Sequence, residues 1–267
     1  MVVKITNLDK ELFTGITKGQ VAEYYRQIAP YMLPYIRGRK LSLVVCPQGV
    51  KQDCFYKKNT QKNSPLTPIT CAGDLMEFVQ NNALEFHVFA SREESPNTPD
   101  MMVFDLDPDE GISLSQIRQG AFDLKQILDE LDLVSFLKTS GNKGYHIVVP
   151  LEPLAKWESL WESFTLFAKQ VAQIMEKKWP NLYTTSIRKI ERKGKIFIDW
   201  IRNSKGHTSI APYSVRAKEG ARVSVPISWE ELDLIAPNEI TMDDAIYRAI
   251  NYDPWKKFFT ICQKLKS

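Results

Sequence analysis

The pattern of apolar and polar positions predicts several β-strands. In LEFHVFA (84–90) the apolar residues Leu84, Phe86 and Val88 share one face, and Glu85 and His87 lie on the other. Short apolar runs predict further strands at 41–46, 101–107, 133–137, 144–150 and 195–201. The segment between 137 and 144 is polar and rich in glycine, so the strands on either side of it are expected to form a hairpin.

Helices are predicted where apolar residues recur every three to four positions. Thr17 caps a helix at 18–29 that Pro30 and Pro34 should end, and Ser113 caps one at 114–131. A long helix is expected at 155–178, with an aromatic stripe whose spacing is typical of core, and weaker helices at 229–234 and 241–250. The proline-containing segment 61–74 is expected to be an irregular connection.

These elements predict one mixed α/β domain over residues 1–267. It would have two lobes, an N-terminal part at about 1–83 and a core at about 84–267. The composition, 43% hydrophobic and 25% charged, is typical of a soluble globular protein, and no apolar run is long enough to cross a membrane. Because the N-terminus lacks a signal peptide, we expect a cytoplasmic protein, and Met1 and the basic end favour a free-standing form over an excised domain.

The four cysteines are Cys46, Cys54, Cys71 and Cys262, and they form no CxxC pair. Together with only three histidines, this spacing argues against a zinc site. Reduced thiols in the core are therefore expected.

Charge is distributed unevenly, although the formal net charge is only +3. Basic clusters occur at 37–40, 51–62 and 188–195, whereas 101–132 is rich in acids. This segregation fits a groove for a polyanion beside a metal site. Each cluster taken alone is more simply a solvated loop or helix face.

Three acids are the candidate metal ligands. Asp105 and Asp107 are two residues apart in MVFDLDP, so in a strand their carboxylates share a face while Phe104 and Leu106 pack behind them. Asp199 ends another apolar strand, where burying an unpaired carboxylate would be costly. Three such acids on neighbouring strands would suit a two-metal centre for phosphoryl transfer. The alternative for the DxD pair is a strand end that meets solvent before Pro108.

The turn in KTSGNKGYH is the candidate phosphate site. Ser140, Lys143 and the backbone N–H groups could bind an anion, and His146 should point the same way as the turn. The motif does not match GxxxxGK[ST] and no helix follows it, which disfavours a P-loop. Phe55 and Tyr56 interleave with Lys58 in a pattern that suits base stacking, although a hairpin with one buried and one exposed aromatic is equally consistent with it.

Together these segments resemble the polymerase domain of bacterial ligase D, a branch of the archaeo-eukaryotic primase superfamily. The motifs that carry the resemblance span almost the whole chain: ITNLDKELF, GITKGQVAEYY, CFYKKN, LEFHVFASR, VFDLDPDEG, LKTSGNKGYHIVVPL, ERKGKIFIDWIRNSKGHTSIAPYSVRA and VSVPISWEEL. It implies largely antiparallel sheets flanked by helices around a primase-polymerase-like catalytic core. One departure is Cys54, Phe55 and Tyr56, where the family usually has glycine and two phenylalanines.

The resemblance also implies residue roles. Asp105, Asp107 and Asp199 would hold two Mn²⁺ or Mg²⁺ ions, and His87, Ser140, Lys143, His146 and Arg216 would bind the nucleotide. The residues implied to contact DNA are Lys10 and Lys18, at a 5′-phosphate, Phe55 and Tyr56, at the template, and Lys58 and Arg192.

The function that these roles imply is template-directed addition of nucleotides, with a preference for ribonucleotides, at DNA ends and gaps during nonhomologous end joining. Ku and a ligase are the implied partners, and the nucleoid the implied location. A primase and a non-catalytic DNA-end-binding or bridging module are the alternatives. A nuclease or a DxD glycosyltransferase is disfavoured because neither explains the clustered phosphate-binding residues.

Overall fold

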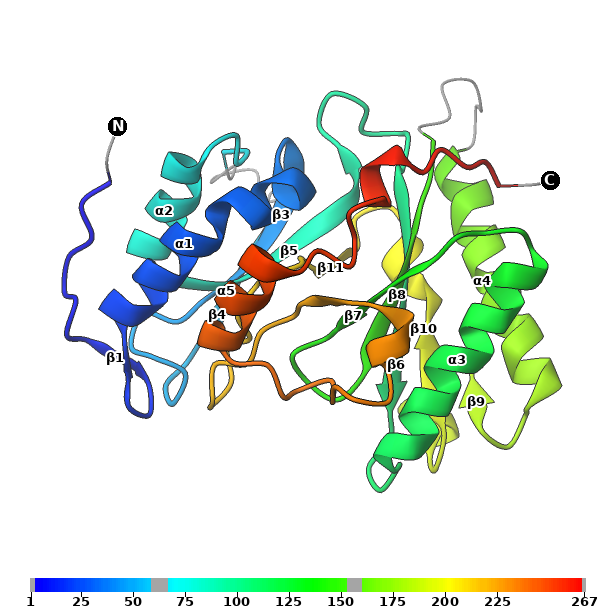
Figure 1. The fold of residues 1–267 in the computed structure, drawn as a ribbon. Coiled ribbons are helices and arrows are strands. Elements are labelled where there is room, and N and C mark those ends of the chain that lie inside the picture. Colours follow the sequence, from blue (N-terminus) through cyan, green and yellow to red (C-terminus); the bar gives the residue numbers. More distant parts are fainter. Residues whose placement is uncertain (1–2, 59–66, 153–159, 266–267) are drawn as a thin grey trace.

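Two β-sheets form the frame of the protein in a computed structural model that describes residues 3–58, 67–152 and 160–265 (Figure 1). The larger sheet contains β6 (Met101–Pro108), β7 (Phe136–Thr139), β8 (Tyr145–Pro150), β9 (Tyr183–Thr184), β10 (Ile196–Asp199) and β12 (Pro226–Ile227). Their order is β12-β7-β8-β6-β10-β9. Every neighbouring pair is antiparallel except β9 and β10.

The smaller sheet is wholly antiparallel and has the order β11-β5-β3-β4. Its strands are β3 (Arg39–Val45), β4 (Phe55–Lys58), β5 (Ala83–Arg92) and β11 (Thr208–Ile210). A separate hairpin near the N-terminus pairs β1 (Glu11–Phe13) with β2 (Ile16–Thr17).

Helices pack beside both sheets. Among the described residues, the α-helices are α1 (Lys18–Ile36), α2 (Ala72–Gln80), α3 (Leu114–Glu130), α4 (Leu160–Lys178) and α5 (Met242–Asn251). In Figure 1, α1 and α2 lie on the side of the smaller sheet, α3 and α4 on the side of the larger sheet, and α5 beside α1. Short 3₁₀ helices lie at η1 (Lys189–Arg192), η2 (Trp200–Asn203), η3 (Trp229–Glu231) and η4 (Phe258–Thr260).

The helix α1 continues past the point where its prolines were expected to end it. Pro30 and Pro34 both lie inside the helix, on its exposed face. A proline has no backbone N–H, so the carbonyl one turn earlier loses its helical hydrogen bond. On the exposed face that carbonyl can accept from water instead, so the loss costs less than it would in the core. Burial of Ile28, Met32 and Ile36 on the opposite face holds the helix together.

Most predicted elements are present. The strands of LEFHVFA and of the acidic segment, the β7–β8 hairpin and the Ser113-capped helix α3 are confirmed. The weaker helix at 229–234 is only a 3₁₀ turn. The beginning of the predicted helix at 155–178 and part of the connection at 61–74 lie outside the described residues. How the chain divides into lobes stays a prediction.

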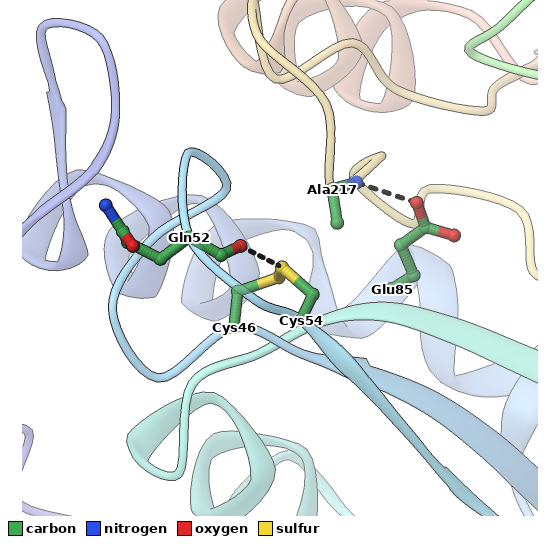
Figure 2. Close-up of a disulfide and its surroundings, with 5 residues drawn as sticks. All are labelled: Cys46, Gln52, Cys54, Glu85 and Ala217. Carbon is green, nitrogen blue, oxygen red and sulfur yellow. Dashed lines mark hydrogen bonds between the residues drawn. A yellow bond between two sulfur atoms is a disulfide. The ribbon is translucent and has the colours of Figure 1, made fainter.

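The expectation of reduced core cysteines is wrong. Cys46 and Cys54 form a disulfide with a Cα–Cα distance of 4.3 Å (Figure 2), and Cys71 and Cys262 are exposed rather than in the core. The reason lies in the register of β3 and β4, which pairs Val45 with Phe55. One further step along both strands brings the two cysteines face to face, at a separation typical of directly opposed residues in an antiparallel pair.

A membrane span requires a long helix with few charges. Within residues 3–58, 67–152 and 160–265, none of the helices meets that requirement.

Candidate active site

The register of the larger sheet brings charged residues into one row. Asp199 on β10 pairs with Asp105 on β6, Asp105 pairs with His146 on β8, and His146 pairs with Lys138 on β7. Directly opposed residues in neighbouring strands point to the same face of a sheet. All four side chains therefore lie on one face, although Asp105 and Asp199 are 94 positions apart in the sequence.

The opposite face of β6 is apolar, as predicted. Phe104 and Leu106 are fully buried, whereas Asp105 is partly and Asp107 largely exposed. On that apolar side a Cβ added to Gly120 of α3 would come within 3.7 Å of Leu106, so the helix packs closely against the strand. The core thus fixes which way the carboxylates point.

Arg202 lies among the carboxylates. Its Nε atom is 2.9 Å from Asp199 Oδ2 and 3.8 Å from Asp105 Oδ2. On the other side of Asp105, His146 Nε2 is 3.3 Å from Oδ1. Asp105 is therefore held between a guanidinium and an imidazole.

These neighbours set the ionisation of the acids. Burial works to raise the pKa of Asp105, but His146 and Arg202 outweigh it and hold that pKa well below its ordinary value. Burial and the charge of Asp105 raise the pKa of Asp107, and burial likewise raises that of Asp199, with Arg202 opposing and Asp105 adding to the effect. The acids repel one another, so further positive charge would be stabilising here.

His146 on β8 and Lys138 on β7 continue the row beyond Asp105. Burial, reinforced by the charge of Lys138, lowers the pKa of His146 to about 4, so the imidazole is neutral at pH 7. Burial also lowers the pKa of Lys138 well below its ordinary value. The Lys138 ammonium donates to Ser224 Oγ at 2.7 Å.

The turn between β7 and β8 is organised by Ser140. Its Oγ accepts the N–H groups of Asn142 at 3.0 Å and Gly144 at 3.2 Å, which leaves its own O–H free to donate to a ligand. Gly144 is required because a Cβ would lie 1.8 Å from Leu106 O. Gly141 has a φ of +67°, and a Cβ there would meet Arg216 Cγ at 2.7 Å. The turn is therefore held tightly between β6 and Arg216.

A groove of about 410 Å³ lies between the charged face of the larger sheet, with its β7–β8 turn, and the smaller sheet. Of the predicted residues it is lined by Asp105, Asp107, Ser140, Lys143, His146, His87, Arg216, Tyr56 and Lys58. On the smaller sheet, Ser42 pairs with both Lys58 and His87, so these three side chains form a second row. Asp199, Arg192, Phe55, Lys10 and Lys18 are not part of the lining.

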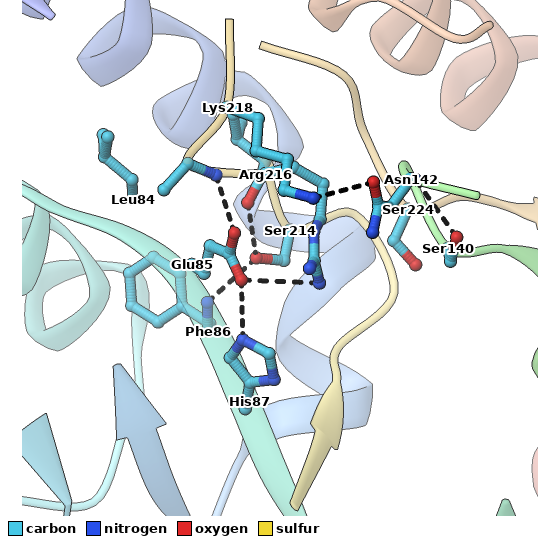
Figure 3. A network of polar contacts seen from close by, with 12 residues as sticks. Leu84, Glu85, Phe86, His87, Ser140, Asn142, Ser214, Arg216, Lys218 and Ser224 are labelled. Atoms are coloured by element: carbon cyan, nitrogen blue, oxygen red, sulfur yellow. Dashed lines mark hydrogen bonds and ion pairs between the residues drawn. The ribbon is translucent and has the colours of Figure 1, made fainter. Parts of the chain in front are cut away.

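A network of polar contacts joins His87 and Arg216 at one end of the groove (Figure 3). Glu85 Oε2 lies 2.7 Å from His87 Nε2 and 3.4 Å from Arg216 Nη1. Burial lowers the pKa of His87, and this effect outweighs that of the Glu85 contact, which works to raise the pKa.

Of the predicted aromatic platform, Tyr56 lines the groove, and Phe55 is exposed outside it. Phe55 and Tyr56 are 51% and 63% exposed, so neither is the buried member of a hairpin pair. Lys58 and Tyr56 lie on the same face of β4, toward the groove, and Phe55 lies on the other. An exposed aromatic beside basic residues is the arrangement that stacks on nucleic-acid bases.

Lys10 and Lys18 lie together, away from the groove. The backbone N–H of Lys18 donates to Lys10 O at 2.7 Å, the Lys18 ammonium donates to Gln80 O at 2.6 Å, and that of Lys10 donates to Pro47 O. Burial, with the charge of Lys10, lowers the pKa of Lys18. The two ammonium groups repel each other, so a bound anion would relieve the repulsion.

Arg192 stands at the edge of the carboxylate face. Its guanidinium lies 3.5 Å above the centre of the Phe197 ring, and Nη1 is 3.9 Å from Asp107 Oδ2. Phe197 pairs with Asp107 across β10 and β6, so the ring is part of the same face. One residue of the basic cluster at 188–195 therefore lies beside the candidate metal ligands.

The carboxylates offer hard oxygen ligands of the kind that Mg²⁺ and Mn²⁺ prefer. In the part of the chain that the structure describes, no group of three or more Asp, Glu, His or Cys side chains is arranged so that it could hold a metal ion. Arg202 lies against two of the carboxylates, so a metal would have to displace it. The charge repulsion among the acids makes divalent cations a suitable replacement.

Sequence reasoning missed four residues of the site. Arg202 and Glu85 lie inside segments that carry the family resemblance but were given no role there, although each lies within three residues of a predicted site residue. Ser42 lies in a segment that the sequence predicts as a buried strand, and Lys138 lies in the polar turn predicted to follow residue 137. Only the strand register shows that they share faces with His87 and His146.

Comparison with known proteins is consistent with this geometry. Residues 17–255 match the model of the LigD primase-polymerase domain. The multifunctional nonhomologous end-joining protein LigD of Mycolicibacterium smegmatis is 33% identical, over 94% of this chain and 35% of that protein. The bifunctional LigD of Bacillus subtilis is 30% identical, over 92% of this chain and 42% of that protein. The chain thus spans about a third to two fifths of these relatives.

A solved structure gives the same result. The polymerase domain of Mycobacterium tuberculosis ligase D, in complex with DNA, superposes with a TM-score of 0.86 at 34% identity, covering 97% of this chain and 98% of that one. The mixed, largely antiparallel fold is therefore confirmed as that of the ligase D polymerase domain. By its sequence over 17–255 and by its fold, the chain belongs to the LigD primase-polymerase domain family.

Proposed function

We propose that this chain is a template-directed nucleotidyltransferase that extends DNA 3′ ends at breaks and gaps during nonhomologous end joining. The observation that supports this best is the groove itself. Asp105 and Asp107 line it from the larger sheet, and His87 lines it from the smaller sheet. Arg216 lines it from between Glu85 and the Ser140 turn. A nucleoside triphosphate with its divalent counter-ions has the charge pattern that such a groove would bind.

The three acids would hold two divalent cations, Mn²⁺ or Mg²⁺. When bound, such ions lower the pKa of the primer 3′-hydroxyl and neutralise charge on the departing pyrophosphate. Asp105, whose pKa lies well below the ordinary value, is ionised at any physiological pH. His146, neutral at pH 7 and 3.3 Å from Asp105, would fix the orientation of that carboxylate.

The phosphates would lie along the turn. Ser140 would donate its O–H, and the exposed Lys143 would supply a positive charge. His87 would contact the triphosphate from the smaller sheet, and Arg216 would contact it from beside the turn. Because these residues come from β5, the β7–β8 turn and the segment after β11, the phosphate site would depend on both sheets. This arrangement would keep the reacting phosphate in line with the attacking oxygen.

The DNA would be held outside the groove. Lys10 and Lys18 would bind a 5′-phosphate, which would relieve the repulsion between their ammonium groups. Phe55 and Tyr56 would stack on template bases, with Lys58 and Arg192 beside the nucleic-acid backbone. Work at the nucleoid with Ku and a ligase, and a preference for ribonucleotides, are part of this proposal.

The test is incubation of the protein with Mn²⁺, ribo- or deoxyribonucleoside triphosphates and a gapped duplex with a labelled primer. We expect template-matched extension that is stronger when the gap carries a 5′-phosphate. The Lys18→Gln variant should lose that dependence and keep extension on a duplex without the phosphate. Lys40→Gln, an exposed lysine outside both sites, is the matched control.

Other outcomes would favour the alternatives. Synthesis that starts on a bare single strand, without a primer, would indicate a primase. Binding that depends on the 5′-phosphate, without any extension, would indicate an end-binding module.

A further inference from the structure

Glu85 is a buried acid next to two candidate triphosphate ligands. On β5 it shares a face with His87, because residues two apart in a strand point the same way. The flanking residues Leu84 and Phe86 are fully buried in the core. The side chain of Glu85 therefore cannot turn toward bulk solvent without disrupting the strand.

Three donors from two parts of the chain meet on this carboxylate. Oε1 accepts the backbone N–H of Ala217 at 2.7 Å (Figure 2), and Oε2 contacts both His87 Nε2 at 2.7 Å and Arg216 Nη1 at 3.4 Å (Figure 3). His87 belongs to β5, whereas Arg216 and Ala217 follow β11. Glu85 thus ties together two segments that contribute separately to the groove.

The charge of Glu85 is retained despite its burial. Burial works to raise its pKa, but the contacts with His87, Arg216 and Ala217 outweigh it, so the pKa lies below the ordinary value. A buried carboxylate that stays ionised must be compensated by positive charge. Here the compensation comes from the residues that face the groove.

Both partners keep capacity for a ligand. Arg216 Nε is buried and has no hydrogen-bond partner in the described part of the chain. His87 donates from Nε2 to Glu85, so Nδ1 is the ring nitrogen left, and it can donate to a phosphate oxygen when the imidazole is protonated. Arg216 also packs against Gly141, where an added Cβ would lie 2.7 Å from Cγ. The guanidinium is therefore confined between Glu85 and the Ser140 turn.

From this geometry we propose that Glu85 is a positioning residue. It holds His87 and Arg216 in the orientation that binds the triphosphate, before the nucleotide arrives, and this inference rests on the proposed function. Without it the two side chains would have to be ordered during binding, at a cost in affinity.

The variant to test is Glu85→Gln, which keeps the shape and an acceptor for Ala217 but removes the charge. The Michaelis constant for the nucleotide should rise by about tenfold or more, with a much smaller change in kcat. Affinity for 5′-phosphorylated DNA should not change. The control is Asp123→Asn, which also replaces a buried acid, but one that lies in α3 and accepts from Tyr183 and Gln119. We expect it to lower the melting temperature and leave the Michaelis constant unchanged.

A double-mutant cycle separates positioning from general stability. Arg216→Ala should raise the Michaelis constant, and adding Glu85→Gln to it should have a smaller effect than Glu85→Gln has alone, because the two residues act together. Fully independent effects would overturn the proposal. So would a nucleotide Michaelis constant in Glu85→Gln that stays within the error of the wild type.

Direct titration with ATP and Mn²⁺, without DNA, distinguishes the two proposals. If the wild type extends no primer but binds ATP more tightly than Glu85→Gln does, the proposed function fails and the role of Glu85 stands. If the wild type extends primers and Glu85→Gln binds ATP equally well, only the role of Glu85 fails. If the wild type neither extends nor binds ATP, both fail.

Discussion

Arg202 Nε contacts Asp199 Oδ2 at 2.9 Å, so a guanidinium occupies one side of the candidate metal site. The same atom is 3.8 Å from Asp105. Arg202 follows Asp199 by three residues in η2, which returns its side chain toward the strand that it has just left. Arg202 and a divalent cation would compete for the same two carboxylates.

This competition predicts the effect of Arg202→Gln. Removing the guanidinium should tighten Mn²⁺ binding by about twofold to fivefold, as expected from a partly exposed ion pair. Mn²⁺ affinity can be measured by electron paramagnetic resonance without nucleotide or DNA. The control is Arg188→Gln, an exposed arginine that pairs with Glu191. Unchanged or weaker Mn²⁺ binding in Arg202→Gln would show that Arg202 does not compete.

Asp199→Asn tests the carboxylate row itself. Loss of one charged oxygen ligand should weaken Mn²⁺ binding by about tenfold or more and abolish extension. Binding to gapped DNA, measured by fluorescence anisotropy, should stay close to that of the wild type. Asp129→Asn, on the exposed side of α3, should change neither property. Normal extension by Asp199→Asn would remove this residue from the metal site.

Lys138 predicts a dependence of stability on pH. Its pKa in the folded protein lies well below the ordinary lysine value, so the unfolded chain binds more protons in the window between the two. The free energy of unfolding should therefore rise with pH in that window, by up to about 1.4 kcal/mol per pH unit, and level off above about pH 10.4. Lys138→Met should have a flatter profile between pH 7 and 10 in urea unfolding experiments. The exposed control Lys40→Met should keep the wild-type slope. If Lys138→Met also keeps that slope, this reasoning is contradicted.

The disulfide makes a prediction that needs no DNA. In denaturant without reductant, only Cys71 and Cys262 should react with a thiol reagent, and Cys46 and Cys54 should react only after reduction. The double variant Cys46→Ser/Cys54→Ser should lose about 2 kcal/mol of unfolding free energy, the amount expected for a short closed loop. Cys71→Ser/Cys262→Ser serves as the control. Four reactive thiols before reduction would refute the pairing.

Much of this fold could be predicted from local patterns. The alternation in 84–90, the cap at Ser113 and the glycine-rich turn after 137 each depend on neighbouring residues, and each prediction is confirmed. Helix α2 was missed because two prolines before it dominated the interpretation. Asp74, which accepts from Thr70 and Cys71, and the spacing of Leu75 and Val79 could have indicated it.

The rest depends on contacts that are distant in the sequence. That Asp105 and Asp107 share a face follows from strand geometry, but the pairing of Asp105 with Asp199 and His146 follows only from sheet register. The contact of Glu85 with Arg216 joins β5 to the segment after β11, and no local pattern encodes it. The disulfide likewise depends on the alignment of β3 with β4.

The pairing of β10 with β6 also limits how this protein can change in length. Side chains of a strand alternate between its two faces, so deleting or inserting one residue between Ile196 and Asp199 would turn the carboxylate toward the apolar layer below α3 and α4. Substitutions within β10 can alter the site by small degrees. Inserting or deleting one codon within the strand cannot, because it moves the carboxylate to the other face of the sheet. Evolution can therefore lengthen or shorten this region only in the segments on either side of the strand.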